Sequence, residues 1–232
     1  MLGHLPAAAF FAPRPALIPD MLGYGSRDSV APEAISLRAQ ADDIAAQIRR
    51  AGYVTAHMVG HSVGGAVAML VARHHPEIAA SVINVEGNFT LDDAFWTGQL
   101  AAMPVPEVAA LLEGYRDDVS GWLRRARIEP APRRIAIASR ALRAQSAAAV
   151  KATALSVIAT TAAPAFLDDV RAVLDSGIPV HLFAGELSRD RWHVPEWVVS
   201  RAASMTLQPG VGHMMMLEEP EEFLRLISKL LP

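Results

Sequence analysis

The stretch from residue 59 to residue 65, Val-Gly-His-Ser-Val-Gly-Gly, constrains the fold of this chain more than any other. A short apolar run, 53–59, leads into it, and a run of small and apolar residues, 66–72, follows. The first run is typical of a buried strand and the second of a buried helix, so the pattern predicts a sharp strand-to-helix turn with Ser62 at its apex. The glycines on both sides of the serine would remove side chains that clash in such a bend. Ser62 is therefore the candidate nucleophile.

The same turn would place a hydrogen-bond donor beside the serine. Val63 begins the predicted helix, and its backbone N–H would point to the place where a carbonyl oxygen becomes negative during attack. A glycine-serine turn can also be purely structural. The strand before it and the helix after it favour the catalytic interpretation.

Two further segments extend the pattern along the chain. Residues 18–25 read Ile-Pro-Asp-Met-Leu-Gly-Tyr-Gly, and residues 210–213 read Gly-Val-Gly-His. With the serine turn between them, they resemble the P-D-x-x-G-x-G loop, the nucleophile elbow and the histidine loop of the α/β-hydrolase fold family. The resemblance implies a mostly parallel sheet with helices on both faces and a catalytic triad of serine, acid and histidine.

The resemblance also implies a division of the chain. We expect residues 1–89 and 164–232 to form the α/β core, with a strand at 16–19, and residues 90–163 to form a helical cap, or lid. Prolines separate the helical stretches that we predict within this insertion. Four large side chains in it could line an apolar acyl pocket, although such residues at helical spacing more often form a core. They are Trp96, Met103, Tyr115 and Trp122.

His213 is the predicted general base. A serine hydroxyl is a poor nucleophile at its own pKa, so a neighbouring base must take its proton. His213 follows the last predicted strand on a loop with glycines at 210 and 212, and it is placed where the Ser-acid-His order puts the base. His61 lies beside the serine and is expected to pack or to bond with backbone instead.

The acid of the triad is less clearly marked. After the strand at 180–184, the family commonly has Gly-x-x-Asp, whereas this chain has serine at position 188. Three carboxylates could hold the imidazole. We rank Glu86 first, because it ends the strand beside the nucleophile strand, Asp190 second and Glu186 third. Asp20 is expected to accept hydrogen bonds from nearby backbone instead of taking part in catalysis.

The front of the chain departs from the family pattern. The residues before position 13 occupy the place of the family's oxyanion loop, with the usual His-Gly pair inverted as Gly3-His4. The resemblance implies Leu5 as the second oxyanion N–H. Little sequence remains for the strand before this loop or for the earlier strands. We therefore hypothesise that the first strands are missing and that the chain is a shortened version of a longer hydrolase.

The composition of the chain limits the classes of partner and cofactor that we expect. The chain has 232 residues, of which 52% are hydrophobic, and its 21 basic and 24 acidic residues give a net charge of −3. Without a strong charge imbalance or a long uninterrupted apolar stretch, we expect neither nucleic acid nor membrane as a partner. The absence of cysteine excludes disulfides and thiolate metal sites. No metal or cofactor is expected, the expected location is the cytoplasm, and the oligomeric state is left open.

The resemblance and the candidate triad together predict a serine hydrolase. We expect it to cleave small to medium, apolar carboxylic esters through an acyl-enzyme intermediate, with a small molecule as its substrate. The alternatives are a carbon–carbon bond or lactone hydrolase of the same fold, and a degenerate hydrolase that binds a ligand without catalysis.

Overall fold

The computed structural model describes residues 14–232 of the chain. In this part, four parallel strands form one sheet in the order β1-β2-β3-β4. The strands are β1 (Ala56–His61), β2 (Ala79–Val85), β3 (Val180–Gly185) and β4 (Ser204–Gln208). The predicted α/β fold, with a parallel sheet between helices, is confirmed.

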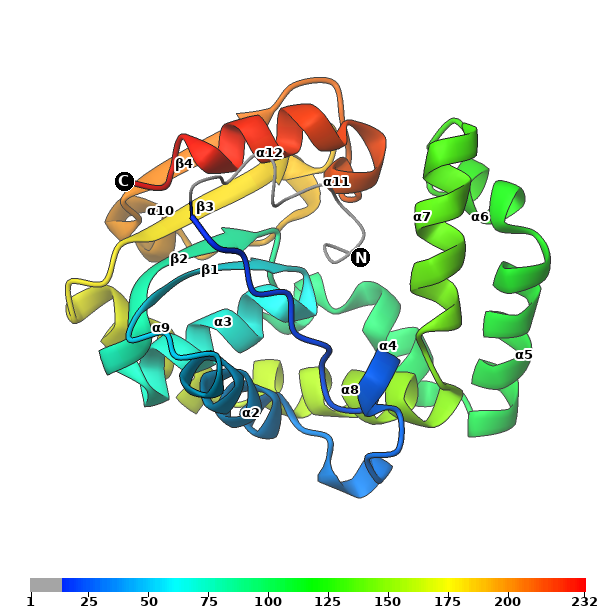
Figure 1. Cartoon of the computed structure of the whole chain (residues 1–232), viewed down its shortest axis with the longest axis horizontal. Helices are drawn as coiled ribbons and strands as arrows, with labels where there is room; N and C mark the ends of the chain where they lie inside the picture. The colour runs from blue at the N-terminus through cyan, green and yellow to red at the C-terminus, as the bar shows by residue number, and fades with distance from the viewer. Residues whose placement is uncertain (1–13) are drawn as a thin grey trace.

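Helices connect the strands and cover both faces of the sheet, as Figure 1 shows. The helices of the core are α2 (Leu37–Arg50), α3 (Val63–His74), α9 (Pro164–Asp175), α10 (Glu196–Arg201), α11 (Met215–Glu218) and α12 (Pro220–Ser228). The helices of the insertion, between β2 and α9, are α4 (Phe95–Ala102), α5 (Val105–Asp117), α6 (Val119–Arg125), α7 (Pro132–Arg143) and α8 (Ala147–Ala162). In Figure 1, α2, α3 and α9 lie below the sheet, α11 and α12 lie above it, and α5, α6 and α7 stand to its right.

The two faces of the sheet bury different apolar clusters. On one face, Val82 and Leu182 pack with α2, α3, α9 and α10. On the other face, Ile83 and Phe183 pack with α11 and α12, and buried side chains of α6 and α7 join the same cluster. Alternation of side chains along each strand explains this division, because successive residues point to opposite faces. The second cluster also fixes α6 and α7 against the core, beside the carboxyl ends of the strands.

The local signals at helix ends match the observed boundaries. The Ser36 side chain accepts a hydrogen bond from Ala39 N at 3.0 Å and so caps α2, whose apolar face carries Ala41, Ala45 and Ile48 into the core. The elbow helix α3 is buried from Gly65 to Ala72, as its run of small apolar residues predicts.

The predicted strand at 16–19 is wrong. These residues carry no strand pairing, and Leu17 and Ile18 are 41% and 45% exposed. The physical reason is the missing neighbour: within residues 14–232, β1 pairs with β2 alone, so the sheet offers no adjoining strand on that side for residues 16–19. An apolar tetrapeptide forms a strand only where its backbone groups find a partner.

No single helix in the described part of the chain is long and apolar enough to cross a membrane. The consecutive helices α8 and α9 reach the required length and composition only as a pair that is bent by 76°.

Candidate active site

Ser62 occupies the bend between β1 and α3. Its backbone angles, φ 53° and ψ −122°, lie outside the regions that non-glycine residues favour. Two hydrogen bonds hold it there: Ser62 N donates to Val85 O at 2.9 Å, and Gly65 N donates to Ser62 O at 2.8 Å. A strained conformation that the surrounding structure fixes in this way is frequent at functional sites.

The glycines around the serine have different roles. A Cβ at Gly60 would collide with the backbone carbonyl of Gly64, and a Cβ at Gly65 would lie 2.6 Å from Gly87 Cα. A Cβ at Gly64 would meet nothing within 4 Å. The expectation that both glycines flanking the serine prevent a clash is therefore wrong for Gly64. Gly65 is required instead, because it allows α3 to approach the end of β2.

His213 and Glu86 lie in direct contact. His213 Nδ1 and Glu86 Oε2 are 2.6 Å apart, and the Glu86 side chain is only 3% exposed. Glu86 follows β2 with φ 43°, a left-handed conformation that turns the chain sharply at the end of the strand. A buried carboxylate on Nδ1 fixes the tautomer of the imidazole and leaves Nε2 as the atom that can accept a proton.

The remaining oxygen of Glu86 is also held. Ser188 Oγ donates to Glu86 Oε1 at 2.5 Å, and Gly185 N donates to the same oxygen at 2.8 Å. Ser188 is buried and is the residue found where the family commonly has aspartate. The position thus contributes a donor to the carboxylate of Glu86 in place of a carboxylate of its own.

The other candidate acids lie elsewhere. Asp190 is exposed in the short 3₁₀ helix η6 (Arg189–Arg191) and makes no contact with His213. Glu186 Oε2 accepts a hydrogen bond from Gly210 N at 2.8 Å, so it supports the backbone of the histidine loop. Asp20 accepts hydrogen bonds from the backbone and hydroxyl of Ser26.

His61 lies between the serine turn and the histidine loop. Its Nε2 is 2.9 Å from the carbonyl oxygen of His213, and the two rings are 4.5 Å apart. Burial, together with the neighbouring His213, lowers the pKa of His61 well below its ordinary value. A neutral imidazole that donates Nε2–H to the carbonyl fits this environment.

Ser62 is connected to the pair of His213 and Glu86 by contacts of adjacent residues. The Ser62 N–H donates to the carbonyl of Val85, the residue before Glu86, and the ring of His61, the residue before Ser62, contacts the ring of His213 at a tilt of 43°. Within residues 14–232, no hydrogen bond joins Ser62 Oγ to His213. All three residues nonetheless lie at the carboxyl ends of the strands, where ligands bind in open α/β sheets.

Of the predicted oxyanion donors, one can be located. Val63 is the first residue of α3, so its N–H has no acceptor within the helix. Leu5 lies outside the described residues. Among residues 14–232, no group of three or more His, Asp or Glu side chains is arranged to hold a metal ion.

Comparison with known proteins agrees with this architecture. A family model described as the alpha/beta hydrolase family matches residues 2–226. The chain belongs to the alpha/beta hydrolase family. The predicted α/β-hydrolase is therefore confirmed at the level of the family, and no curated protein matches the chain at a significant level.

Solved structures of the same fold include several hydrolases. A thermophilic esterase from Thermogutta terrifontis has a TM-score of 0.63 and 21% identity, over 92% of this chain and 78% of that one. An E-2-(acetamidomethylene)succinate hydrolase has a TM-score of 0.65 and 20% identity, over 90% and 78%. An N-acyl homoserine lactonase has a TM-score of 0.62 and 19% identity, over 91% and 76%. At these identities the likeness shows the fold.

In this α/β-hydrolase, the large side chains of the insertion mostly pack among themselves. Met103 and Tyr115 join the apolar cluster of α4, α5 and α8, and Trp122 packs against the cluster of α6, α7 and α11. Trp96 is 46% exposed. Met103, Tyr115 and Trp122 therefore take part in core packing.

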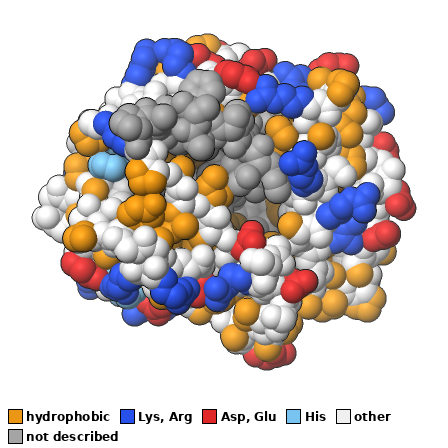
Figure 2. All heavy atoms as spheres, viewed as in Figure 1, with side chains coloured by type: hydrophobic (Ala, Val, Ile, Leu, Met, Phe, Trp, Pro, Cys, Tyr) orange, Lys and Arg blue, Asp and Glu red, His pale blue; other side chains and the backbone are white. Residues whose placement is uncertain are grey.

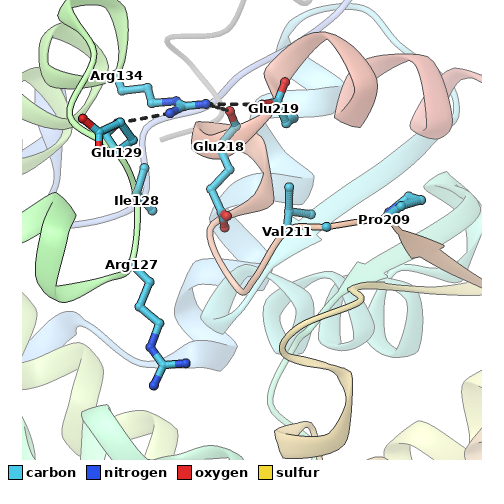
Figure 3. A pocket seen from close by; sticks show the side chains of 9 residues that line it. Arg127, Ile128, Glu129, Arg134, Pro209, Val211, Glu218 and Glu219 are labelled. Atoms are coloured by element: carbon cyan, nitrogen blue, oxygen red, sulfur yellow. Dashed lines mark hydrogen bonds and ion pairs between the residues drawn. The ribbon is translucent and has the colours of Figure 1, made fainter.

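A cavity of about 360 Å³ separates the insertion from the histidine loop. Figure 3 shows its lining side chains. The residues come from the α6–α7 connection and the start of α7, from the histidine loop, and from α11 and the residue after it: Arg127, Ile128, Glu129, Arg134, Pro209, Gly210, Val211, Glu218 and Glu219.

Three residues at this site were not predicted from the sequence: Ser188, Glu218 and Arg127. Ser188 carried a signal, since it stands where aspartate was expected. Glu218, whose Oε1 accepts Gly212 N–H at 2.9 Å, and Arg127 carried none, because their positions depend on contacts between distant segments.

Proposed function

We propose that this chain is a serine hydrolase that cleaves small to medium, largely apolar carboxylic esters through an acyl-enzyme intermediate. The observation that carries the proposal is the contact between His213 Nδ1 and buried Glu86, beside the strained turn at Ser62. An imidazole with a carboxylate on one nitrogen is an effective base at the other, and a serine on a sharp turn exposes its hydroxyl.

The reaction follows from these roles. Ser62 Oγ attacks the ester carbonyl carbon while His213 Nε2 takes the hydroxyl proton, and Glu86 stabilises the resulting imidazolium. The Val63 N–H donates to the oxygen that becomes negative. His213 then returns the proton to the departing alcohol, and the acyl group remains on Ser62. Water, activated by the same imidazole, releases the acid and restores the serine.

A lactone is the second substrate class that we consider. A lactone is a cyclic ester, so attack by Ser62 would open its ring through the same steps, and one neighbour of the same fold is an N-acyl homoserine lactonase. Hydrolysis of a panel of linear esters and lactones, compared by kcat/KM, distinguishes the two classes.

The decisive experiment is the substitution Ser62→Ala. We expect p-nitrophenyl butyrate turnover to fall by at least about 10³-fold, because loss of the nucleophile removes the acyl-enzyme route. The matched control is Ser29→Ala, at an exposed serine, which should keep full activity. Circular dichroism verifies that both variants fold.

A fluorophosphonate probe provides the independent readout. It labels only an activated hydroxyl, so peptide mass spectrometry should locate the label on Ser62 in the unmodified protein. Persistent ester turnover by Ser62→Ala would contradict the assignment. A folded protein that is neither labelled nor active would favour a ligand-binding role without catalysis.

A further inference from the structure

Arg127 occupies a helix end where glycine is favoured. Helix α6 ends in a Schellman motif, in which Ile128 N donates to Leu123 O and Arg127 N donates to Arg124 O, both at 2.9 Å. The motif requires a left-handed residue, and Arg127 has φ 62°. Glycine adopts this conformation without steric cost, whereas a residue with a Cβ is strained. The arginine therefore reduces the stability of the turn relative to glycine.

The guanidinium of Arg127 has no partner in the described part of the chain, unlike those of Arg125, Arg133 and Arg134. Arg133 pairs with Glu221, and Arg134 donates to Glu218 O at 2.6 Å and to Glu219 Oε1 at 3.3 Å. In Figure 3, Arg127 extends away from Arg134 and its ion pair. The guanidinium of Arg127 therefore lines the cavity without an ion pair or hydrogen bond to another described residue.

The cavity adjoins the loop that carries His213. Gly210 and Val211 form part of its wall, three and two residues before His213 respectively. Figure 2 shows Lys and Arg side chains on the right of the molecule, over α5, α6 and α7, with Asp and Glu side chains among them.

The acidic side chains that line the cavity limit the negative charge of a ligand that can bind there. Glu219 is paired with Arg134, and Glu218 accepts the Gly212 N–H. Glu129 is exposed, and Figure 3 shows it directed to the opposite side from Arg127. With three glutamates against two arginines in the lining, a phosphate dianion would be repelled. A single carboxylate matches one free guanidinium, with which it can form paired hydrogen bonds.

We propose that Arg127 binds a carboxylate on the substrate, and that the preferred substrates are esters whose acyl chain ends in a carboxylate. This inference rests on the proposed hydrolysis at Ser62 and names its substrate class. Arg127 acts on specificity and takes no part in bond cleavage.

Two esters of equal length test the inference. In mono-p-nitrophenyl adipate a carboxylate replaces the terminal methyl group of p-nitrophenyl hexanoate. We expect Arg127→Gln to lower kcat/KM for the adipate ester at least about 10-fold and that for the hexanoate ester by no more than about 2-fold, because only the anion loses a charge-assisted pair. Arg124→Gln is the matched control: Arg124 is exposed on the same helix but does not line the cavity, and both esters should change by no more than about 2-fold.

A glycine variant separates binding from folding. Arg127→Gly relieves the positive φ, so its melting temperature should rise by about 2–4 °C while the adipate ester is lost as a preferred substrate. A merely structural arginine would give no such opposite pair of effects. An equal loss of activity toward both esters in Arg127→Gln would overturn the inference.

A binding measurement that needs no catalysis tests the role of Arg127 independently of the proposed serine mechanism. Calorimetry with adipate and the Ser62→Ala protein should detect binding, weakened at least about 10-fold by the added Arg127→Gln change. Failure of adipate to bind, or equal affinity in the two proteins, would refute the role of Arg127. Continued ester cleavage by Ser62→Ala would instead refute the serine mechanism and leave the binding result to stand on its own.

Discussion

At the scale of single residues, the carboxylate that contacts His213 comes from Glu86, and a serine occupies position 188, where aspartate was expected. Glu86 contacts His213 from the end of β2, while Ser188 donates to Glu86 from the loop after β3. Because the serine hydroxyl is 2.5 Å from Glu86 Oε1, an acid at position 188 would lie close to the same imidazole.

This arrangement predicts that the acid can be moved. Glu86→Gln should lower kcat by about 10³–10⁴-fold, because the amide no longer stabilises the imidazolium. Adding Ser188→Asp should restore part of the loss by supplying a carboxylate from the neighbouring loop. Steady-state kinetics with p-nitrophenyl butyrate measures both effects. Asp190→Asn serves as the control, and a larger loss there than in Glu86→Gln would make Asp190 the acid.

At the scale of elements, the packing of α3 against β2 depends on one glycine. Gly65 faces Gly87 and the Asn84 amide, whereas Gly64, one residue earlier on the same helix, faces open space. The two positions provide a matched pair, since both are glycines in the first turn of α3.

We expect opposite effects of alanine at these two positions. Gly65→Ala should reduce the free energy of unfolding by about 1–3 kcal/mol, because its Cβ forces α3 away from backbone that cannot yield. Gly64→Ala should be neutral or stabilising by up to about 1 kcal/mol, because alanine is the better helix former. Urea unfolding followed by circular dichroism measures both values. Equal effects would mean that the close contact at Gly65 does not limit packing.

How far the sequence predicts the molecule differs between these scales. The strand before the serine turn, the helix after it and the strand at 180–184 follow from local apolar patterns, which the chain carries within each segment. The strand expected at 16–19 failed because strand formation needs a partner, and pairing is not a local property. Glu86 could be ranked first from its place at a strand end, but its bond to Ser188 and the left-handed turn at Arg127 arise only once distant segments meet.

At the scale of the whole molecule, histidines make stability sensitive to pH. Burial lowers the pKa of His57, His61, His74 and His181 below the ordinary value. The unfolded chain therefore takes up protons near pH 6.5 that the folded chain does not, and stability is lost as pH falls through this value toward the lowered pKa values. Burial raises the pKa of Asp93 and Glu218, which acts in the opposite direction at lower pH.

We accordingly expect the free energy of unfolding to be smaller at pH 5.5 than at pH 7.5. Urea titrations at the two pH values and constant ionic strength measure the difference. His61→Asn should reduce this difference, since it removes the histidine whose pKa is lowered most strongly by its surroundings. A folded state that is as stable at pH 5.5 as at pH 7.5 would contradict the linkage.

Among residues 14–232, the non-glycine residues with a positive φ are Ser62, Glu86 and Arg127. One is the proposed nucleophile, one the proposed acid and one the proposed specificity residue. The backbone angles alone therefore identify the same three positions to which we assign catalytic and specificity roles. Structures of related chains can be searched in the same way for non-glycine residues with a positive φ, even where the sequence motifs of those chains differ.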